Sequence, residues 1–196
     1  MLVGCEFSGA VTETFRRKGH DAWSCDLIPS TGTKFHIQDD LQKALLLEQW
    51  DMLVAFPPCT YLCSSGLHWN KKVPERLNLT EQAAEFFLSL ATADVPKIAL
   101  ENLIGCMSTR FRKPDQIIQP WMFGHSVNKS TCLWLKNLPK LQPTNVVPQD
   151  EVITFPNGKR QSKWYYETSL ARHEDRGSIR SVTFPGIAQA MADQWG

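Results

Sequence analysis

The strongest constraint on the fold is a short apolar run that ends in two prolines. Residues 50–56 have the length and composition of a strand that is buried on both faces, as in a parallel sheet. Pro57 and Pro58 end this strand, because proline has a fixed φ and cannot donate a ladder hydrogen bond. Cys59 is therefore presented just beyond the carboxyl end of a strand, where ligands bind in open α/β sheets. A buried thiol without a chemical role is the alternative for Cys59.

The start of the chain predicts a strand, a turn, a helix and a second strand. Residues 1–9 form the strand and a glycine-bearing turn, and residues 10–18 follow with a helical pattern. The second strand, residues 21–27, ends in Asp26. Such a unit suits an adenosine-type cofactor, because Gly9 allows close backbone approach and Asp26 can accept hydrogen bonds from ribose hydroxyls. The complete G-x-G-x-x-G pattern is absent, which argues against a dinucleotide.

The rest of the chain alternates predicted strands and helices. In order these are a polar turn at His36–Leu41, a helix at Leu41–Glu48, an irregular loop at Ser64–Asn78, a helix at Glu81–Ala93 capped by Thr80, strands at Lys97–Leu100 and Thr131–Leu135, and a helix at Ile187–Trp195. This alternation indicates an α/β fold, a Rossmann-like and mainly parallel sheet with helices on both faces. We expect one domain over residues 1–196. The proline-bearing residues 137–182 are expected to be loop-rich and to act as a lid or a reduced recognition region.

Composition places the chain among ordinary globular proteins. Its 196 residues are 42% hydrophobic and 21% charged. No apolar run reaches the roughly eighteen residues that predict a membrane span. The first residues carry neither a basic nor a long apolar stretch, so we expect no signal peptide and a cytoplasmic location. The first strand begins almost at Met1, which leaves open whether residues precede it. A net charge of +1 neither favours nor excludes a nucleic-acid partner.

Six cysteines are scattered along the chain. We expect them to be reduced thiols, since several fall within predicted strands of a mid-sized α/β protein. A zinc site at Cys59 and Cys63 is the next alternative, but no second Cys/His pair with the spacing of a zinc finger accompanies them. We therefore predict no metal, and we expect Cys63 to be a packing thiol.

Several short motifs occur along the chain in the order Glu6-Phe7-Ser8-Gly9, Asp26, Asp40, Pro58-Cys59, Glu101-Asn102 and Pro185-Gly186-Ile187. Together they resemble the cytosine-C5 methyltransferase family of S-adenosylmethionine-dependent enzymes, and most closely its short phage-type DNA cytosine methyltransferases. The resemblance covers most of the chain and keeps the order of the motifs. It implies transfer of a methyl group from S-adenosylmethionine, which becomes S-adenosylhomocysteine, to C5 of cytosine in DNA.

The resemblance also implies roles for individual residues. The opening motif would place a Phe against the adenine, two acids would contact the ribose and the adenine amino group, and proline-containing motifs would complete the cofactor site. These cofactor residues are Glu6, Phe7, Ser8, Gly9, Asp26, Asp40, Pro58, Pro185 and Gly186. Cys59 would be the nucleophile, and Glu101 and Asn102 would engage the base. Substrate contacts are expected at Pro57, Thr60, Trp69 and Lys129.

The chemistry of a pyrimidine explains why a cysteine and a glutamate belong together. C5 of a pyrimidine is a poor nucleophile, but a thiolate that adds to C6 makes C5 enamine-like, and cysteine can leave again afterwards. Negative charge develops on the base, so an acid at N3 lowers the barrier, and Glu101 needs a raised pKa to hold that proton. Asn102 would position the loop of Cys59 or hold the base edge. In duplex DNA the target base must be flipped out of the stack to reach Cys59.

The chain departs from the family pattern at three places. Thr60 stands where the family usually has Gln. The later Gln-x-Arg-x-Arg element has only Asn128 and Lys129 as its nearest equivalents. The large target-recognition region of the family would have to fit within residues 137–182, which are too few for a complete one.

Other functions stay open on the sequence. In the DNA hypothesis the loop Ser64–Asn78 and the basic-aromatic segment 159–176 hold the strand. The same chemistry on a free pyrimidine nucleotide suits the near-neutral charge and the short insert. A non-catalytic module that binds the cofactor or a partner protein would explain the departures from the family pattern. A thiol hydrolase is disfavoured, because no histidine after Cys59 has the context of a catalytic dyad, and His68 and His125 are expected to be polar loop residues. The target sequence and the oligomeric state are open.

Overall fold

The computed structural model describes residues 1–196 as one seven-stranded sheet with helices and a separate β-hairpin. The strands are β1 (Leu2–Gly4), β2 (Trp23–Asp26), β3 (His36–Gln38), β4 (Met52–Ala55), β5 (Lys97–Leu103), β6 (Gln116–Ile118), β7 (Thr131–Lys136), β8 (Val152–Thr154) and β9 (Arg160–Ser162). The α-helices are α1 (Ala10–Arg17), α2 (Leu41–Ala44), α3 (Ser64–Leu67), α4 (Glu75–Ala91), α5 (Met107–Arg110), α6 (Lys163–Leu170), α7 (Asp175–Ser181) and α8 (Pro185–Trp195). Two 3₁₀ helices are η1 (His68–Lys71) and η2 (Pro120–Met122).

The large sheet has the strand order β3-β2-β1-β4-β5-β7-β6. Its strands run parallel except β7, which is antiparallel to both of its neighbours β5 and β6. This is a Rossmann-like fold with a mainly parallel sheet, as the alternation of elements predicts. The strand order reverses between β1 and β4, so the loops that follow these two strands flank the crevice where α/β sheets bind ligands.

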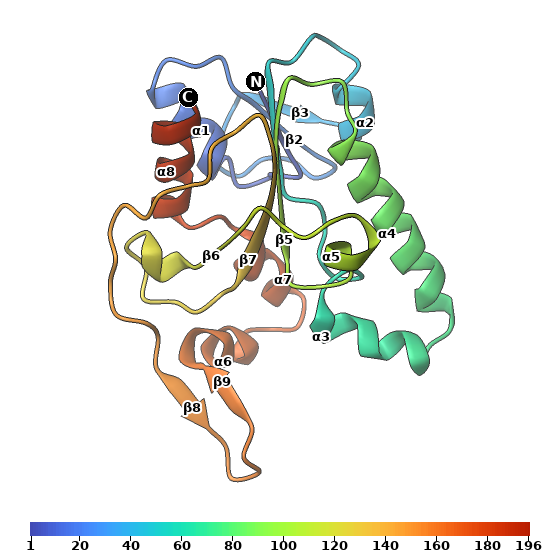
Figure 1. Cartoon of the computed structure of the whole chain (residues 1–196), viewed down its shortest axis with the longest axis vertical. Helices are drawn as coiled ribbons and strands as arrows, with labels where there is room; N and C mark the ends of the chain where they lie inside the picture. The colour runs from blue at the N-terminus through green and yellow to red at the C-terminus, as the bar shows by residue number, and fades with distance from the viewer.

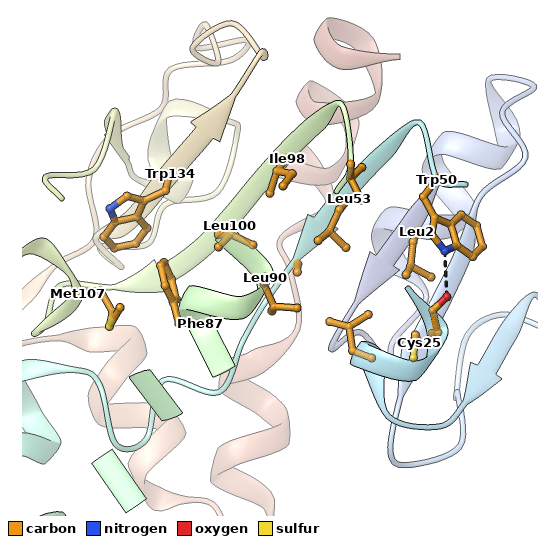
Figure 2. Packing of buried hydrophobic residues seen from close by; sticks show 14 of the residues in the cluster. Leu2, Cys25, Trp50, Leu53, Phe87, Leu90, Ile98, Leu100, Met107 and Trp134 are labelled. Carbon is orange, nitrogen blue, oxygen red and sulfur yellow. Dashed lines mark hydrogen bonds between the residues drawn. The ribbon is translucent and has the colours of Figure 1, made fainter. Parts of the chain in front are cut away.

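Side chains alternate between the two faces of the sheet and form two cores. On one face Leu53 of β4 and Leu100 of β5 pack with α2 and α4, as the cluster in Figure 2 shows. On the other face Val3 and Val54 pack with α1 and α8. Figure 1 shows α1 and α8 on one side of the sheet and α4 on the other. Covering both faces buries β4 completely, which explains its continuous apolar sequence.

Helix α4 begins earlier than predicted. Its first residue is Glu75 rather than Glu81, and Thr80 lies buried inside the helix instead of capping it. The Thr80 hydroxyl donates to the carbonyl of Arg76 at 3.1 Å, the i−4 contact that a helical threonine can make. Pro74 precedes the helix and is the start signal, because proline is favoured where helical N–H groups have no partner. The loop predicted over 64–78 is therefore wrong, since α3, η1 and the first turn of α4 occupy it.

Two edge strands and the length of β5 also differ from the prediction. The segment predicted as a polar turn contains β3, which pairs with β2, and β6 was not predicted. Strand β5 continues to Leu103, so Glu101 and Asn102 lie within the strand rather than beyond it. The antiparallel partner β7 extends it, because Thr131 pairs with Leu103. Helix α2 ends at Ala44, short of the predicted Glu48.

The segment 137–182 is more regular than predicted. Residues 152–181 form the β8–β9 hairpin followed by α6 and α7, and only the part before the hairpin lacks helices and strands. Ser162 caps α6 by accepting a hydrogen bond from the N–H of Tyr165, and Asp150 accepts one from Trp164 at 2.9 Å. Figure 1 shows the hairpin projecting from the body of the molecule below α6. Its action as a lid or recognition region stays a prediction.

No helix of this chain combines the length and the apolar character needed to cross a membrane.

Candidate functional site

The loop after β1 is held by a buried carboxylate. Glu6, which is 4% exposed, accepts hydrogen bonds from the backbone N–H groups of Val11 and Thr12 at 2.6 and 3.2 Å and from the Thr12 hydroxyl at 2.6 Å. Burial raises the pKa of Glu6, while these hydrogen bonds oppose the shift. Both oxygens thus face the first turn of α1, where a negative charge is favourable. Glu6 therefore supports the loop, and its contact with a cofactor stays a prediction.

Position 9 needs a glycine for two reasons: its backbone conformation is left-handed, and a neighbouring loop leaves no room for a side chain. Its φ is +69°, in the left-handed region, and an added Cβ would lie 2.9 Å from Thr33. The loop Ser30–Thr33 therefore lies close to the Gly9 backbone, and the approach of a ligand to Gly9 stays a prediction. The Thr31 N–H donates to the carbonyl of Phe7 at 2.9 Å. Ser8 accepts a long hydrogen bond, 3.4 Å, from the N–H of Ala10.

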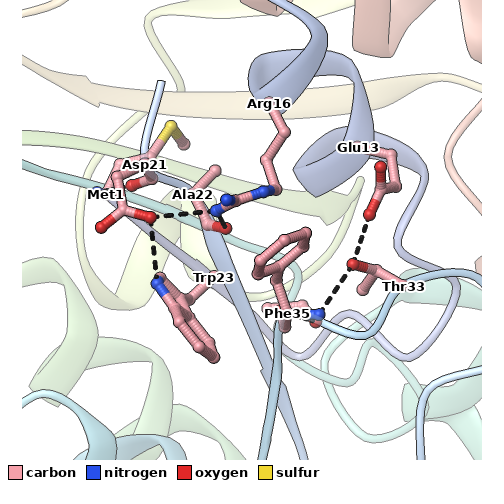
Figure 3. Close-up of polar contacts among 9 residues, drawn as sticks. Met1, Glu13, Arg16, Asp21, Ala22, Trp23, Thr33 and Phe35 are labelled. Carbon is pink, nitrogen blue, oxygen red and sulfur yellow. Dashed lines mark hydrogen bonds and ion pairs between the residues drawn. The ribbon is translucent and has the colours of Figure 1, made fainter. Parts of the chain in front are cut away.

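Figure 3 shows how the segment after β2 is anchored to α1. The Thr33 hydroxyl donates to Glu13 of α1 at 2.5 Å and accepts from the N–H of Phe35 at 3.1 Å. Arg16 donates to Asp21 and lies 3.2 Å from the centroid of the Phe35 ring. These contacts give the Ser30–Thr33 loop a defined position over the β1–α1 loop.

The predicted cofactor acids gather around Cys5. Burial raises the pKa of Cys5, and the negative charges of Asp26 and Asp40 add to the shift. Asp26, at the end of β2, is partly exposed and accepts from the N–H of Ile28 at 3.3 Å. Asp40 is the N-cap of α2 and accepts from the N–H of Gln42 at 2.7 Å. Asp26 is the acid whose carboxylate is better available to hydroxyl groups, since its single contact is long.

A rigid turn presents Cys59 beyond β4. The N–H groups of Leu62 and Cys63 both donate to the carbonyl of Cys59, at 3.0 and 2.9 Å, which closes one helical turn. The buried side chain of Asn102 donates to the carbonyl of Pro57 at 2.8 Å. Asn102 therefore ties β5 to the loop that carries Cys59, the positioning role that was one of its two predicted functions. Pro58, the other proline of the motif, is exposed.

Three charged or reactive groups converge at the carboxyl ends of β4 and β5. Burial raises the pKa of Glu101, while the charge of Lys129 and a hydrogen bond from Thr131 oppose the shift. A hydrogen bond to Cys63, followed by burial and the charges of Cys63 and Glu101, raises the pKa of Cys59, and Lys129 opposes this as well. Cys59, Glu101 and Lys129 therefore lie within electrostatic reach of one another, although they come from separate parts of the chain.

The segment 137–182 reaches this group through two side chains. Burial raises the pKa of Tyr165 on α6, and the charges of Cys59 and Cys63 contribute to the shift. The Arg180 guanidinium lies 4.4 Å from the centroid of the Tyr165 ring, and the Lys129 ammonium donates to the carbonyl of Arg180 at 2.8 Å. Helices α6 and α7 thus lie against the thiol site, with Lys129 joining them to the core of the protein.

A cavity of about 450 Å³ opens beside Tyr165. Its lining is mostly polar and combines the β8–β9 hairpin, the start of α6 and the residue before Lys129. The lining residues are Asn128, Val152, Arg160, Gln161, Ser162 and Tyr165. Tyr165 thus lines the cavity and is also influenced by the charges of Cys59 and Cys63.

The start of α8 is held by a histidine. The Nε2 atom of His125 accepts a hydrogen bond from the N–H of Gly186 at 2.9 Å, and burial lowers the pKa of His125. A Cβ on Gly186 would lie 1.8 Å from the carbonyl of Phe123, so only glycine fits there. Pro185 is exposed. His125 was expected to be a plain loop residue, and its structural role is invisible without the fold.

Two predicted substrate residues lie on the loop after Cys59. Thr60 is exposed, and its carbonyl accepts a long contact, 3.5 Å, from Arg76, whose guanidinium lies 4.7 Å from the centroid of the Tyr61 ring. Trp69 is 46% exposed on η1, and its ring packs with His68 and with Lys72. These contacts place Thr60 at the rim of the site and Trp69 on the neighbouring surface.

The sequence analysis gave no individual role at the site to Tyr165, Arg180, Thr131 or Arg76, and it expected Cys63 to be a packing thiol. All six cysteines are free, and no group of three or more His, Cys, Asp or Glu side chains is arranged to hold a metal ion. The four-residue spacing of Cys59 and Cys63 was the one available signal, because residues four apart share a helix face. The aromatic run around Tyr165 was a weaker signal, whereas Arg180 carries none, and both residues reach the site only through tertiary contacts.

No family model and no curated protein matches the sequence. Among solved structures, one described as a candidate DNA modification methyltransferase encoded within a prophage of E. coli matches with 14% identity and a TM-score of 0.47. The match covers 75% of this chain and 51% of the other, so the chain spans about half the length of that structure. A likeness this distant says nothing about the reaction, and the site's own residues must carry a functional proposal.

Proposed function

We propose that this protein transfers a methyl group from S-adenosylmethionine to C5 of cytosine in DNA through a covalent adduct with Cys59. The observation that carries the proposal is the meeting of a thiol and a carboxyl group whose pKa is raised by burial, at the ends of the adjacent strands β4 and β5. A nucleophile with a proton donor as its neighbour is what addition to a pyrimidine requires. Lys129 adds a positive charge at the place where the base becomes negative.

Each of these side chains has one task in the proposed reaction. The Cys59 sulfur forms a bond to C6 of the base, and the electrons of the ring move toward N3. Glu101 supplies a proton to N3, which leaves C5 nucleophilic enough to take the methyl group. Water then takes the proton from C5, the electrons of that C–H bond form the C5–C6 double bond as Cys59 leaves as a thiolate, and Glu101 recovers its proton from N3. Asn102 keeps Cys59 in place by its hydrogen bond to Pro57.

The cofactor site is proposed at the carboxyl ends of β1, β2 and β3. When bound, S-adenosylmethionine supplies the methyl group from a sulfonium centre. The chain's residues fit an adenosine moiety, because Asp26 is partly exposed and has a carboxylate engaged by one long contact. The β1–α1 loop is held by Glu6 and opens onto the crevice between β1 and β4. Phe7 is partly buried on this loop and provides an aromatic face.

Replacing Asp26 with alanine is expected to weaken S-adenosylmethionine binding about tenfold or more, because a charge-assisted hydrogen bond to the ribose is lost. Isothermal titration calorimetry measures this directly and needs no turnover. Asp51→Ala is the matched control, since Asp51 is an exposed acid at the opposite end of β4. Equal affinity in the Asp26 variant and the wild type would remove the cofactor site from this edge of the sheet.

DNA is the preferred substrate because Tyr165, which is influenced by the charges of the thiols, also lines a cavity. A free nucleotide needs one pocket, whereas a polynucleotide also needs room for the neighbouring groups. The cavity of about 450 Å³ beside Tyr165 has Arg160 in its lining, which suits a sugar-phosphate group next to the flipped base.

The experiment that tests the function is transfer of labelled methyl from S-adenosylmethionine. The purified protein is offered duplex DNA, single-stranded DNA, dCMP and dUMP in parallel. The expected result is label at cytosine C5 in DNA. Label in a free nucleotide only would replace DNA as the substrate class, and cofactor binding without any transfer would favour a non-catalytic binding module.

A further inference from the structure

The helical turns that follow Cys59 carry exposed aromatic and basic side chains. Trp69 on η1 is 46% exposed, and its neighbours Lys71 and Lys72 are exposed as well. Arg76 follows in the first turn of α4 and is partly buried. Together these four residues are called the η1 surface.

The η1 surface is positive in a chain that is otherwise balanced. Between residues 59 and 80 the basic residues are Lys71, Lys72 and Arg76, and the one acidic residue is Glu75. The whole chain, in contrast, has 21 basic and 20 acidic residues. The η1 surface therefore complements a negatively charged partner.

Trp69 is held in place although nearly half of it is exposed. The N–H groups of Lys72 and Val73 both donate to the carbonyl of Trp69 at 2.9 Å, which fixes the turn of η1. The side chain of Asn70 donates to the buried hydroxyl of Thr80 at 2.9 Å and docks η1 on α4. The Lys72 ammonium lies 4.9 Å from the centroid of the Trp69 ring. A preformed aromatic face of this kind loses little conformational entropy when a ligand binds to it.

The η1 surface adjoins the turn that carries Cys59. The Arg76 guanidinium lies 4.7 Å from the centroid of the Tyr61 ring and makes a long contact, 3.5 Å, with the carbonyl of Thr60. A Cβ on Gly66 would lie 2.5 Å from the same carbonyl, so α3 packs directly on this turn. In Figure 1, α3 lies beyond the lower end of the sheet and leads into the start of α4. A ligand on the η1 surface is therefore next to the proposed nucleophile.

Arg76 has hydrogen-bonding capacity that the protein leaves unused. Its Nε atom is buried without a partner, and the one hydrogen bond of its guanidinium is the long contact with Thr60. A guanidinium has five N–H donors in a planar fork that matches a phosphate group. Because the ring of Tyr61 supports the guanidinium, Arg76 is suited to hold a phosphate beside Cys59.

An exposed tryptophan among cations favours an unpaired strand over a duplex. In a duplex the faces of each base are covered by the neighbouring base pairs, so a tryptophan on the protein surface gains no stacking area. An unpaired base can lie on the ring of Trp69 while cations contact the backbone, and such stacking tolerates any sequence. The net charge of +1 agrees with this, because tight binding of a duplex relies on many phosphate contacts.

We propose that the η1 surface holds an unpaired strand beside Cys59, so that the preferred substrate is cytosine in single-stranded DNA. One base stacks on Trp69, and Lys71 and Lys72 contact phosphates on either side of it. Arg76 holds a phosphate closer to Cys59. A cytosine in a single strand reaches Cys59 without the cost of breaking a base pair. The preference in methylation rests on the proposed function, whereas binding of the strand does not.

The test is a binding measurement that needs neither cofactor nor turnover. Fluorescence anisotropy compares a labelled single strand of DNA with the duplex made from it. The wild type is expected to bind the single strand about tenfold more tightly than the duplex. Trp69→Ala is expected to weaken binding of the single strand about tenfold, the effect of losing one stacked base, and to leave duplex binding unchanged. Trp69→Phe keeps an aromatic face and should restore most of the affinity, which separates stacking from a folding defect.

The salt dependence of the same binding tests the cations. Lys72→Ala is expected to reduce the slope of log affinity against log salt by about 0.7, the value for one phosphate contact of a single strand. Arg76→Lys keeps the charge but loses the planar fork and the stack on Tyr61, so the affinity should fall while the slope stays the same. Lys97→Ala is the matched control, because Lys97 is an exposed lysine at the amino end of β5, far along the strand from Glu101.

Equal or tighter binding of the duplex by the wild type overturns the inference, and so does unchanged binding of the single strand by Trp69→Ala. Methyl transfer that is faster on duplex than on single-stranded DNA would overturn the substrate preference while leaving the proposed function intact. The expected binding without methyl transfer to any substrate would refute the proposed function and leave the strand-binding surface intact.

Discussion

Cys59→Ala is expected to abolish methyl transfer while S-adenosylmethionine affinity stays within a few-fold of the wild type. Without the sulfur no bond to C6 forms, and C5 stays too weak a nucleophile to take the methyl group. The cofactor site is proposed at the ends of β1, β2 and β3, so its contacts do not include the Cys59 side chain. The loop should keep its shape, because Asn102 and the turn hydrogen bonds hold its backbone rather than its thiol.

Two measurements separate the chemical role of Cys59 from a structural one. Calorimetry reports cofactor binding, and the labelled-methyl assay reports transfer to DNA. A DNA duplex with fluorine at C5 of the target cytosine cannot lose a C5 proton, so it should trap the wild type as an adduct visible in the intact mass. The Cys59 variant should form no adduct, whereas Cys106→Ala should behave as the wild type. Turnover close to the wild type in Cys59→Ala would show that another group is the nucleophile.

Glu101→Gln is expected to slow methyl transfer by about a hundredfold or more, the typical effect of losing a positioned acid. Glutamine keeps the size and hydrogen-bonding reach of the side chain but cannot give a proton to N3. Affinity for cofactor and for DNA should change little, so the loss should appear in kcat.

The pH profile gives a second signature for Glu101. Burial raises its pKa, so the protonated, active form is present at low pH and is lost as pH rises through the raised value. The wild-type rate should therefore fall on the alkaline side, and the Glu101 variant should lack that limb. Glu81→Gln is the matched control, because Glu81 on α4 is an exposed glutamate paired with Arg110 of α5. A Glu101 variant as fast as the wild type would exclude Glu101 as the acid at N3.

The parts of the fold that sequence predicted well are those with local signals. The run before Pro57 became β4, a buried central strand, because a strand covered on both faces must be apolar throughout. The first strand–helix–strand unit and the final helix follow from their periodicity. The prediction errors lie where a strand depends on pairing with another strand that is distant in the sequence. Strand β7 lengthens β5, and β2 supplies the pairing that makes a strand of the polar residues at β3.

The sequence determined the inventory of the site: a cysteine after two prolines, a glutamate followed by an asparagine on the next strand, and an acid at the end of β2. Strand ends and parallel order are enough to bring these together, because adjacent parallel strands share one carboxyl edge. Only the tertiary structure decided how each side chain is used. It turned Glu6 onto α1, and it closed the turn that sets Cys63 against Cys59.

The tertiary structure also decided which groups from distant parts of the chain lie near Cys59. Lys129, Tyr165 and Arg180 lie on three different elements, and no spacing in the sequence connects them to Cys59. Their positions follow from tertiary contacts, because the Lys129 ammonium donates to the Arg180 carbonyl and the Arg180 guanidinium lies over the Tyr165 ring. Local sequence signals thus decided which residues lie at the carboxyl edge of the sheet. Tertiary packing decided which charged and aromatic groups surround them, and these groups shift their pKa values.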